Sequence, residues 1–357
     1  MLSLMAQFSI AVIAGDGVGG EVVPEAIRVL DRVTKLDYTY FDWGSEYFLH
    51  HRRMMPADAL DTLRKFDAIL LGAIGHPDIP DHITLNGLLL PIRRAFDQYA
   101  NVRPAFLYPG VASPLANAGP IDMIVVRENT EGEYAQVGGF LYQHQPEEVA
   151  IQTAVFTRRG VERVVRHAFE LAVRRNKKRK VTSITKSNAQ GFGMVLWDRA
   201  FAKVAAEFPE IDTESLLVDA AAMNFVRRPA SFDVVVGSNL FGDILSDLSA
   251  VITGSIGLAA SANLDPTRKN PSMFEPVHGS APDIAGRGVV NPLAMILSGS
   301  MMLDHLGLAE AAKSIERAVA TLLADGKIRT PDLGGISSTR EVTDAVIAAI
   351  NGNAHVH

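Results

Sequence analysis

Cysteine is absent from the 357 residues of the sequence. This absence excludes disulfide frameworks, cysteine-ligated zinc, iron–sulfur clusters and catalysis by a thiol. A basic excess is absent too, since 34 Lys and Arg residues stand against 40 Asp and Glu residues and the formal net charge at pH 7 is −6. The chain therefore has no overall positive field that would attract nucleic acid.

Long hydrophobic runs are also lacking. The longest uncharged run, Pro104–Ile121, contains four prolines and cannot form a membrane-spanning helix. The first residues lack a basic segment and a long apolar core, so we expect no signal peptide and a cytoplasmic protein.

The residues that are present are typical of a globular protein. Hydrophobic residues make up 48% of the chain and charged residues 21%, which excludes a largely disordered chain. Because a single core rarely grows beyond about 250–300 residues, the length predicts two lobes or domains.

Short apolar runs alternate with helical patterns along most of the chain. We expect strands at Phe8–Ala14, Asp37–Phe41, Ala68–Leu71, Met123–Val126, Val181–Ile184, Glu214–Val218 and Val234–Val236. We expect helices at Gly20–Lys35, Ala57–Arg64, Arg159–Arg174, Gly193–Glu207, Ala220–Arg227, Ile244–Thr253, Ala294–Leu306, Ala309–Asp325 and Ser337–Asn351. Such alternation is typical of an α/β fold with much parallel strand pairing.

The middle of the chain departs from this pattern. Pro104–Pro120 is rich in proline, and Ala135–Thr157 combines paired glycines with tyrosine, glutamine and β-branched residues. We interpret the second stretch as a protruding β arm.

A glycine motif lies near the start. Gly15–Gly20 (GDGVGG) follows a predicted strand, precedes a predicted helix and fits the G-x-G-x-x-G fingerprint of dinucleotide-binding Rossmann domains. Asp37 or Asp42 could supply the acidic residue that the fingerprint requires at the end of the second strand. The alternative is a glycine turn that lets a strand and a helix pack closely.

Three aspartates are spaced for a metal ion. Asp243 and Asp247 follow the strand Val234–Val236 and, four residues apart on a helix, project from one face. Asp219 adds a third carboxylate just after another predicted strand, where α/β sheets place ligands. Hard oxygen ligands suit Mg²⁺ or Mn²⁺. The alternative is helix-start chemistry, because aspartates favour the positive end of a helix.

Three arginines are placed for an anionic substrate. Arg93, Arg103 and Arg127 lie at the ends of predicted strands or helices, and guanidinium groups bind carboxylates bidentately. Solvation at the surface is the alternative for each of them, and spacing alone does not separate the two readings.

A lysine, a tyrosine and a histidine loop complete the candidates. Lys186 follows the strand Val181–Ile184, and a lysine beside a divalent cation can act as a base. Tyr134 lies in a glycine-rich turn. Phe274–Ile284 is interpreted as a loop of small residues whose backbone N–H groups can cradle phosphate, with His278 able to stack on or hydrogen-bond a nucleotide. A surface lysine, a packed tyrosine and a turn histidine are the alternatives.

Seven motifs, in order over nearly the whole chain, resemble those of the pyridine-nucleotide-dependent β-decarboxylating dehydrogenases, the isocitrate/isopropylmalate family. They are Gly15–Gly19 (GDGVG), Leu71–Pro77 (LGAIGHP), Asn101–Pro104 (NVRP), Arg127–Tyr134 (RENTEGEY), Thr185–Asn188 (TKSN), Asn239–Asp247 (NLFGDILSD) and Phe274–Gly286 (FEPVHGSAPDIAG).

This resemblance implies a two-lobed, isopropylmalate-dehydrogenase-like α/β fold that is not a Rossmann fold. Its first, cofactor-binding lobe would be discontinuous, with residues 1–100 plus 254–357, and residues 101–253 would form the metal, substrate and dimerisation lobe. The arm at about 135–157 would clasp a second subunit. The resemblance also implies a homodimer in which Lys186, Asn188 and Asp219 are lent to the neighbouring active site.

The resemblance implies a role for each candidate. Asp243 and Asp247, with Asp219 of the partner subunit, would hold Mn²⁺ or Mg²⁺, and a K⁺ requirement stays open. Arg93, Arg103 and Arg127 would bind the substrate carboxylates. Lys186 would take the hydroxyl proton, and Tyr134 would protonate the enolate carbon after loss of CO₂.

The cofactor implied is NAD, bound against the histidine loop. The implied contacts are Asn188, Glu275, His278, Gly279, Ser280, Ala281, Asp283, Ile284 and Asn291. Asp283 followed by Ile284 resembles the NAD-preferring pattern, because an aspartate accepts from ribose hydroxyls and repels a 2′-phosphate.

The segment His82–Arg93 bears on the substrate. Asn86 replaces the glutamate that isopropylmalate enzymes have there, and Gly87 and Leu89 replace the serine and asparagine of isocitrate enzymes. Phe96–Pro104, Val155–Arg163 and Ser261–Pro266 resemble the tartrate/D-malate branch. We therefore expect oxidative decarboxylation of D-malate to pyruvate and CO₂, with oxidation of tartrate. Leu89 and Leu90 keep 3-isopropylmalate, the substrate of leucine biosynthesis, as the runner-up.

A non-catalytic regulatory paralogue is the alternative from another class. It predicts replacements at Tyr134, Lys186 or the three aspartates, and none of these residues is replaced. The expected partners are thus a small 2-hydroxy di-acid and a second copy of the chain, with neither nucleic acid nor membrane.

Overall fold

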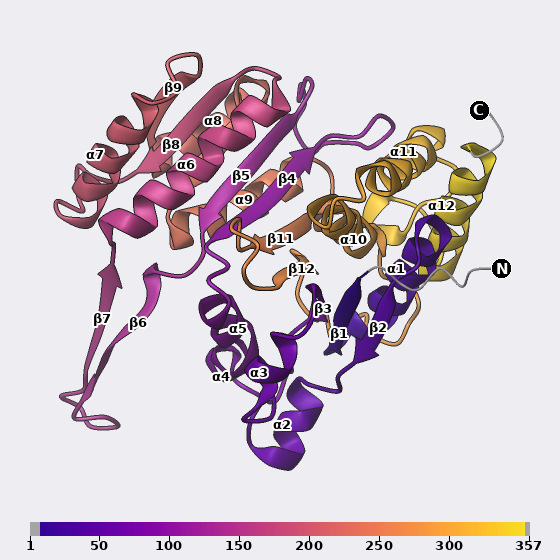
Figure 1. Ribbon diagram of the computed structural model, residues 1–357, viewed down its shortest axis with the longest axis horizontal. Coiled ribbons are helices and arrows are strands. Elements are labelled where there is room, and N and C mark those ends of the chain that lie inside the picture. The colour runs from indigo at the N-terminus through magenta and orange to yellow at the C-terminus, as the bar shows by residue number, and fades with distance from the viewer. Residues whose placement is uncertain (1–7, 354–357) are drawn as a thin grey trace. The chain divides into compact units, whose positions relative to one another are not determined.

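The computed structural model describes residues 8–353 (Figure 1). Two compact units divide the chain. The first contains the described residues up to Gln98, residues 106–116 and those from Ala250 onward, and the second contains Tyr99–Ala105 and Asn117–Ser249. No helix among residues 8–353 is long and apolar enough to cross a membrane.

The first unit is built on strands in the order β2-β1-β3-β12-β11. Its strands are β1 (Ser9–Gly15), β2 (Asp37–Tyr40), β3 (Ala68–Ala73), β11 (Ala260–Leu264) and β12 (Ser272–Pro276). Its helices are α1 (Gly19–Val33), α2 (Ser45–His51), α3 (Ala59–Leu63), α4 (Asp81–Thr84), α5 (Leu90–Ala95), α10 (Leu293–His305), α11 (Ala309–Asp325) and α12 (Thr339–Asn353). Short helical turns lie at Leu85–Leu89, Ile256–Leu258 and Pro331–Leu333.

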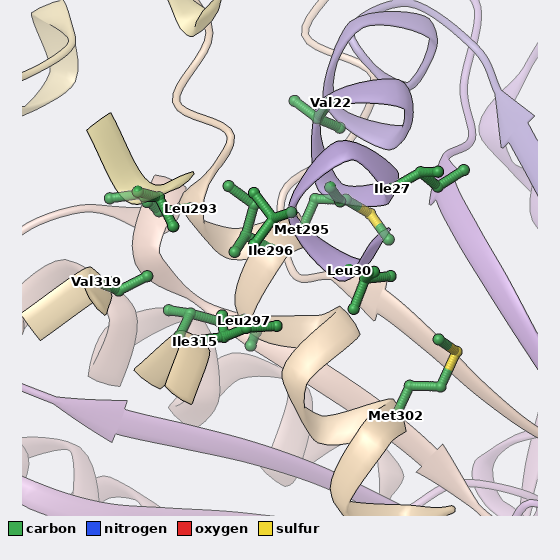
Figure 2. Close-up of a cluster of buried hydrophobic side chains, with 14 of the residues drawn as sticks. Val22, Ile27, Leu30, Leu293, Met295, Ile296, Leu297, Met302, Ile315 and Val319 are labelled. Carbon is green, nitrogen blue, oxygen red and sulfur yellow. The ribbon is translucent and has the colours of Figure 1, made fainter. Parts of the chain in front are cut away.

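Two cores cover the two faces of this sheet because side chains alternate along each strand. In β1, Ile10 and Val12 join the cluster formed with α1, α10, α11 and α12, whereas Ala11 and Ile13 join the cluster formed with α3 and α5. Figure 2 shows α1, α10 and α11 side chains of the first cluster, including Leu30 of α1.

The second unit orders its strands β4-β5-β10-β8-β9. They are β4 (Ala100–Phe106), β5 (Asp122–Glu128), β8 (Lys180–Thr185), β9 (Asp212–Leu217) and β10 (Val234–Gly237). Its helices are α6 (Arg158–Arg175), α7 (Gly193–Ala205), α8 (Val218–Arg227) and α9 (Asn239–Ile252), with a short turn at Pro229–Ser231. β10 pairs in parallel with β5 and β8, and β8 pairs in parallel with β9.

A separate antiparallel pair, β6 (Gly132–Leu141) and β7 (Val149–Val155), extends from the sheet of the second unit (Figure 1). On one face of this pair Val137, Leu141, Val149 and Ile151 are all exposed. Exposed apolar side chains gathered on one face of a ribbon indicate a surface that binds another chain.

The predicted α/β class is confirmed, and three predictions about elements were wrong or incomplete. β4, β11 and β12 were not predicted, and Phe274–Pro276, interpreted as loop, is buried strand. β9 ends at Leu217, so Val218 begins α8 rather than ending a strand. The segment Asp81–Ala95, for which no helix was predicted, is helical throughout.

The glycine motif serves packing. A Cβ on Gly17 would lie 2.1 Å from the Ser280 carbonyl oxygen, and one on Gly15 would lie 2.1 Å from that of Ala73. Both glycines have positive φ, which favours glycine. The Val18 N–H donates to the Ser280 carbonyl. The close-packing interpretation of this turn therefore holds. The strand order β2-β1-β3-β12-β11, with β11 antiparallel to β12, is not that of a Rossmann domain.

Candidate active site

The candidate residues of the second unit lie where its parallel strands end. Arg127 is one residue before the end of β5, Lys186 follows β8, Asp219 lies in the first turn of α8 after β9, and α9 follows β10. Carboxyl ends of parallel strands meet at one edge of a sheet, so all four elements deliver side chains to the same edge.

Asp243 is the centre of one cluster. Its carboxylate accepts hydrogen bonds from Arg127 Nη1, from Arg103 Nη1 at 3.2 Å and from the Tyr134 hydroxyl at 2.9 Å. Arg103 and Arg127 are almost fully buried, with side chains 9% and 3% exposed. The Arg127 guanidinium also lies 5.2 Å from the centroid of the Tyr134 ring. The structure thus brings together four residues that the sequence nominated separately.

Asp247 lies one helical turn after Asp243. Arg103 Nη1 is 3.4 Å from its carboxylate, and 57% of the side chain is exposed. Burial raises the pKa of the Asp247 carboxyl, and Arg103 opposes that shift. Asp243 and Asp247 together present hard oxygen donors on adjacent turns of α9, which fits a divalent cation.

Lys186 and Asp219 form a second group. Their side chains lie 3.1 Å apart, because β8 and β9 pair in register up to Thr185 and Leu217. The hydrogen bond from Lys186 holds the pKa of the Asp219 carboxyl below its usual value. Asn188 is exposed in the turn after Lys186. Within residues 8–353 of one chain, no three acidic or histidine side chains are grouped so as to hold a metal ion.

Three supporting residues were missed by the sequence reasoning. Asn239 accepts from Arg127 Nε and Nη2 at 3.0 and 2.7 Å, and Ser246 accepts from Arg103 Nη1 at 2.7 Å. Glu133 accepts from the Ser238 hydroxyl and the Leu240 N–H, which ties the start of β6 to α9. The spacing of Asn239 and Ser246 around Asp243 in α9 was the signal that could have found two of them.

In the first unit, Arg93 is part of a buried network. Its Nη2 donates to Glu275 Oε1 at 2.7 Å, and Asn263 Nδ2 donates to the same oxygen at 2.8 Å. Arg93 Nε is buried without a partner among the described residues, so the guanidinium keeps a donor for a ligand. Asn263 is a further residue that the sequence did not nominate.

The histidine loop borders a cavity of about 600 Å³ in the same unit. Gly279 and Ser280 line it from one side, and Gly75, His76 and Leu85 line it from the other. A cavity of this size between glycine-rich backbone segments fits part of a dinucleotide.

The remaining histidine-loop candidates differ in accessibility. His278 Nδ1 is 3.0 Å from the Gly279 carbonyl oxygen, while Nε2 is buried without a partner among residues 8–353. Burial lowers the pKa of His278, which favours the neutral form of the ring. Asp283 is exposed, Ile284 is partly buried, and Ala281 has a positive φ of 38°.

Three candidates have their side chains engaged within the first unit. The Asn291 amide donates to Asp332 and accepts from the Leu293 N–H. Asn86 donates to the His82 carbonyl from a π-helical turn. Leu89 is packed into the core cluster with α3 and α5. Leu85, rather than Leu89, lines the cavity.

Arginines, carboxylates and a lysine at the carboxyl ends of parallel strands are groups that can bind a small anion and transfer a proton. Comparison with known proteins gives the family. Residues 9–346 match the model of the family described as isocitrate/isopropylmalate dehydrogenase. The chain belongs to this family of oxidoreductases, as the seven motifs predicted.

Individual relatives cover the whole length. A protein of Agrobacterium vitis named "Probable tartrate dehydrogenase/decarboxylase" is 50% identical, over 98% of this chain and 98% of its own. The D-malate dehydrogenase [decarboxylating] of Escherichia coli K12 is 50% identical, over 97% of this chain and 99% of its own. The crystal structure of isocitrate dehydrogenase from Methylococcus capsulatus has a TM-score of 0.89 at 36% identity, over 96% of this chain and 99% of that one.

Proposed function

We propose that this protein catalyses the NAD- and divalent-metal-dependent oxidative decarboxylation of D-malate to pyruvate and CO₂, and also oxidises tartrate. The observation that carries the proposal is the cluster of Arg103, Arg127 and Tyr134 around Asp243. The cluster brings together two buried guanidinium groups, the Tyr134 hydroxyl as a proton donor and the Asp243 carboxylate as a metal ligand. The relatives named for tartrate and D-malate support this choice of substrates.

The proposed metal site consists of Asp243 and Asp247 with Asp219 of the partner subunit. Mn²⁺ or Mg²⁺ bound there would supply Lewis acidity at the C1 carboxylate and the C2 oxygen of the substrate. In the described chain the charge of Asp243 is balanced by Arg103 and Arg127. A di-acid can replace Asp243 as the partner of these guanidinium groups, which would hold its C2–H toward the nicotinamide.

The chemistry then follows from the chain's own residues. When bound, NAD⁺ would supply the acceptor for the hydride of C2. Lys186 of the partner subunit would take the proton of the C2 hydroxyl. The resulting β-keto acid loses its C4 carboxylate as CO₂, and the C3–C4 bonding electrons remain in the enolate. Tyr134, whose hydroxyl already hydrogen-bonds to Asp243, delivers a proton to C3. Pyruvate and NADH are the products.

NAD is proposed to lie against the histidine loop. The exposed Asp283 carboxylate would accept from the adenosine ribose hydroxyls and repel the 2′-phosphate of NADP. The unpartnered Nε2 of His278 and the open backbone at Gly279 and Ser280 would meet the nucleotide, with Glu275 beside Arg93. Asn188 of the partner subunit would complete the site.

The proposal includes a cytoplasmic homodimer. The apolar face of β6 and β7 would bind the partner subunit, and each subunit would lend Lys186, Asn188 and Asp219 to the other. Asp219 supports this arrangement because its side chain is 62% exposed in the single chain.

3-Isopropylmalate is the alternative substrate. It was favoured by an apolar wall at Leu89 and Leu90, but both side chains are buried, with 9% and 7% exposure. An isopropyl group would therefore find less apolar surface there than the sequence indicated. A difference on the scale of one methylene discriminates only about 10–200-fold in such pockets, so overlapping activities are expected.

Substitution of Lys186 tests the proposal. In Lys186→Ala, turnover of D-malate should fall by at least about 10²-fold because the base is lost, while NADH binding, measured by fluorescence titration, should be retained. Parallel assays of wild type with D-malate, tartrate and 3-isopropylmalate decide the branch. Unimpaired turnover in Lys186→Ala would contradict the proposed mechanism. A preference for 3-isopropylmalate would show that the enzyme is a 3-isopropylmalate dehydrogenase.

A further inference from the structure

A second groove lies in the second unit, away from the residues given catalytic roles. Its volume is about 550 Å³. Four arginines line it, namely Arg158, Arg159, Arg163 and Arg166, together with His167 and Tyr99. Positions 159, 163 and 166 follow the spacing of one helix face, so α6 presents its cations as a row.

The positive charge of this row is only partly neutralised. Two glutamates also line the groove, and one of them, Glu162, pairs with Arg158 at 3.6 Å and with Lys203 at 2.9 Å. Arg166 is paired with Glu207 at 2.7 Å. Arg159 has no ion-pair partner among residues 8–353.

The helix adds to the positive field. Arg158 and Arg159 lie in the first turn of α6, and that turn contains no acidic residue. The amino-terminal end of a helix carries partial positive charge, so cations there are unfavourable unless an anion is near. Glu131 supplies one carboxylate close by, which accepts from the N–H and the hydroxyl of Thr157 and also interacts electrostatically with Arg163.

His167 provides an independent sign of a ligand. Its side chain is 5% exposed and lines the groove, yet neither ring nitrogen has a hydrogen-bond partner among the described residues. Burial, assisted by Arg174, lowers the pKa of His167 to about 4, so the ring is neutral at pH 7 and offers one N–H donor. A buried polar group without a partner is costly, and a bound anion would satisfy it.

The side chain of Arg163 is fixed in the groove by two contacts. Its guanidinium stacks 4.1 Å from the centroid of the Tyr99 ring, and its Nη2 donates to the Thr130 hydroxyl at 3.0 Å. That hydroxyl donates in turn to Glu128, the residue after Arg127. A fixed, stacked guanidinium loses little freedom when it binds an anion.

We propose that this groove is a binding site for a small polyanion, with Arg159, Arg163 and His167 as its ligand-contacting residues. The ligand class is a molecule with two or more negative charges, either phosphate or carboxylate groups. The site does not depend on the proposed reaction, because none of its lining residues has a catalytic role in that reaction. Hydrogen bonds link Arg163 through Thr130 to Glu128. They connect the groove with the end of β5, next to Arg127.

Calorimetric titration with inorganic pyrophosphate and with citrate, at constant ionic strength and without added metal, tests the site. Arg159→Gln should weaken binding of the recognised probe by about tenfold or more, since a charge-assisted contact is lost. Arg199→Gln, which removes an exposed arginine of α7 outside the groove, should leave binding unchanged. Binding of pyrophosphate alone assigns a phosphate ligand, and binding of citrate alone assigns a polycarboxylate. Equal effects of the two substitutions would overturn the proposal.

Histidine NMR separates this groove from any other anion site. The Cε1–H signal of His167, assigned by its loss in His167→Gln, should shift on addition of the bound probe and should not shift in Arg159→Gln. Because each readout is binding rather than turnover, failure of the proposed reaction leaves the test intact. A His167 signal that neither probe moves would overturn the proposal.

Discussion

At the scale of single residues, Glu128 makes the stability of the folded state depend on pH. It is buried at the end of β5 and accepts hydrogen bonds from the Thr130 N–H and hydroxyl and from the Glu131 N–H. Burial raises the pKa of its carboxyl from 4.5 to about 7. The folded state therefore binds the proton more tightly than the unfolded state. This contribution to stability is fully present below pH 4.5 and is lost as the pH rises through 7.

Glu128→Gln should remove this pH dependence. The free energy of unfolding of wild type relative to the variant should fall by about 3 kcal/mol between pH 4.5 and pH 7.5, because the shift spans about 2.5 pH units. Urea unfolding at the two pH values measures it. Glu147→Gln, on the exposed arm, is the control and should show no such change. A difference that grows with pH would contradict the assignment.

At the scale of elements, the approach of α9 to β5 positions Arg127. A Cβ added at Gly242 of α9 would lie 2.6 Å from Arg127 Cβ, so either the helix or the arginine must shift. Gly242→Ala should therefore lower kcat/KM by about 10²-fold, even though alanine favours helix. Gly20→Ala in α1, where a Cβ meets nothing within 4 Å, is the matched control and should be neutral. Full activity in Gly242→Ala would show that this contact does not position Arg127.

The β6–β7 arm gives a second prediction at this scale. Ile151 lies on the apolar face and is 54% exposed, so a charge there should disrupt a dimer that buries this face. Ile151→Glu should have the 38.5 kDa mass of one chain in light scattering, while Gln152→Glu, on the opposite face, should keep twice that mass. Dimeric Ile151→Glu protein would argue against the arm as the interface.

The same elements show how far the sequence could be read. Strands β5, β8 and β10 were predictable because parallel strands are continuous apolar runs. The strand Ser272–Pro276 was not, because it contains a glutamate and a proline, and the buried Glu275 is paired with Arg93, 182 residues away. Contacts between such distant positions leave no local pattern. For the same reason Asn263, which shares the Glu275 carboxylate with Arg93, was missed.

At the scale of the whole molecule, the proposal of shared active sites can be tested by mixing variants. Lys186→Ala and Asp247→Asn subunits should each be inactive alone. A mixed dimer would contain one site with neither substitution. Co-refolding in equal amounts should restore about a quarter of wild-type activity, since half of randomly assorted dimers are mixed.

The control for this experiment combines two substitutions of residues that each subunit is proposed to lend to its partner. Lys186→Ala mixed with Asp219→Asn should give no recovery, because every site would then receive one altered residue from its neighbour. Recovery in both mixtures, or in neither, would contradict lending of Lys186 and Asp219 across the interface.

The most direct test of the proposed reaction follows the carbon that leaves. D-Malate labelled with ¹³C at C4 would be incubated with NAD⁺ and Mn²⁺, and labelled CO₂ and NADH would be measured together. We predict that the two appear in equal amounts, with unlabelled pyruvate, and that a chelator abolishes both. Formation of NADH without labelled CO₂, or turnover that persists in the chelator, would contradict metal-dependent oxidative decarboxylation by this protein.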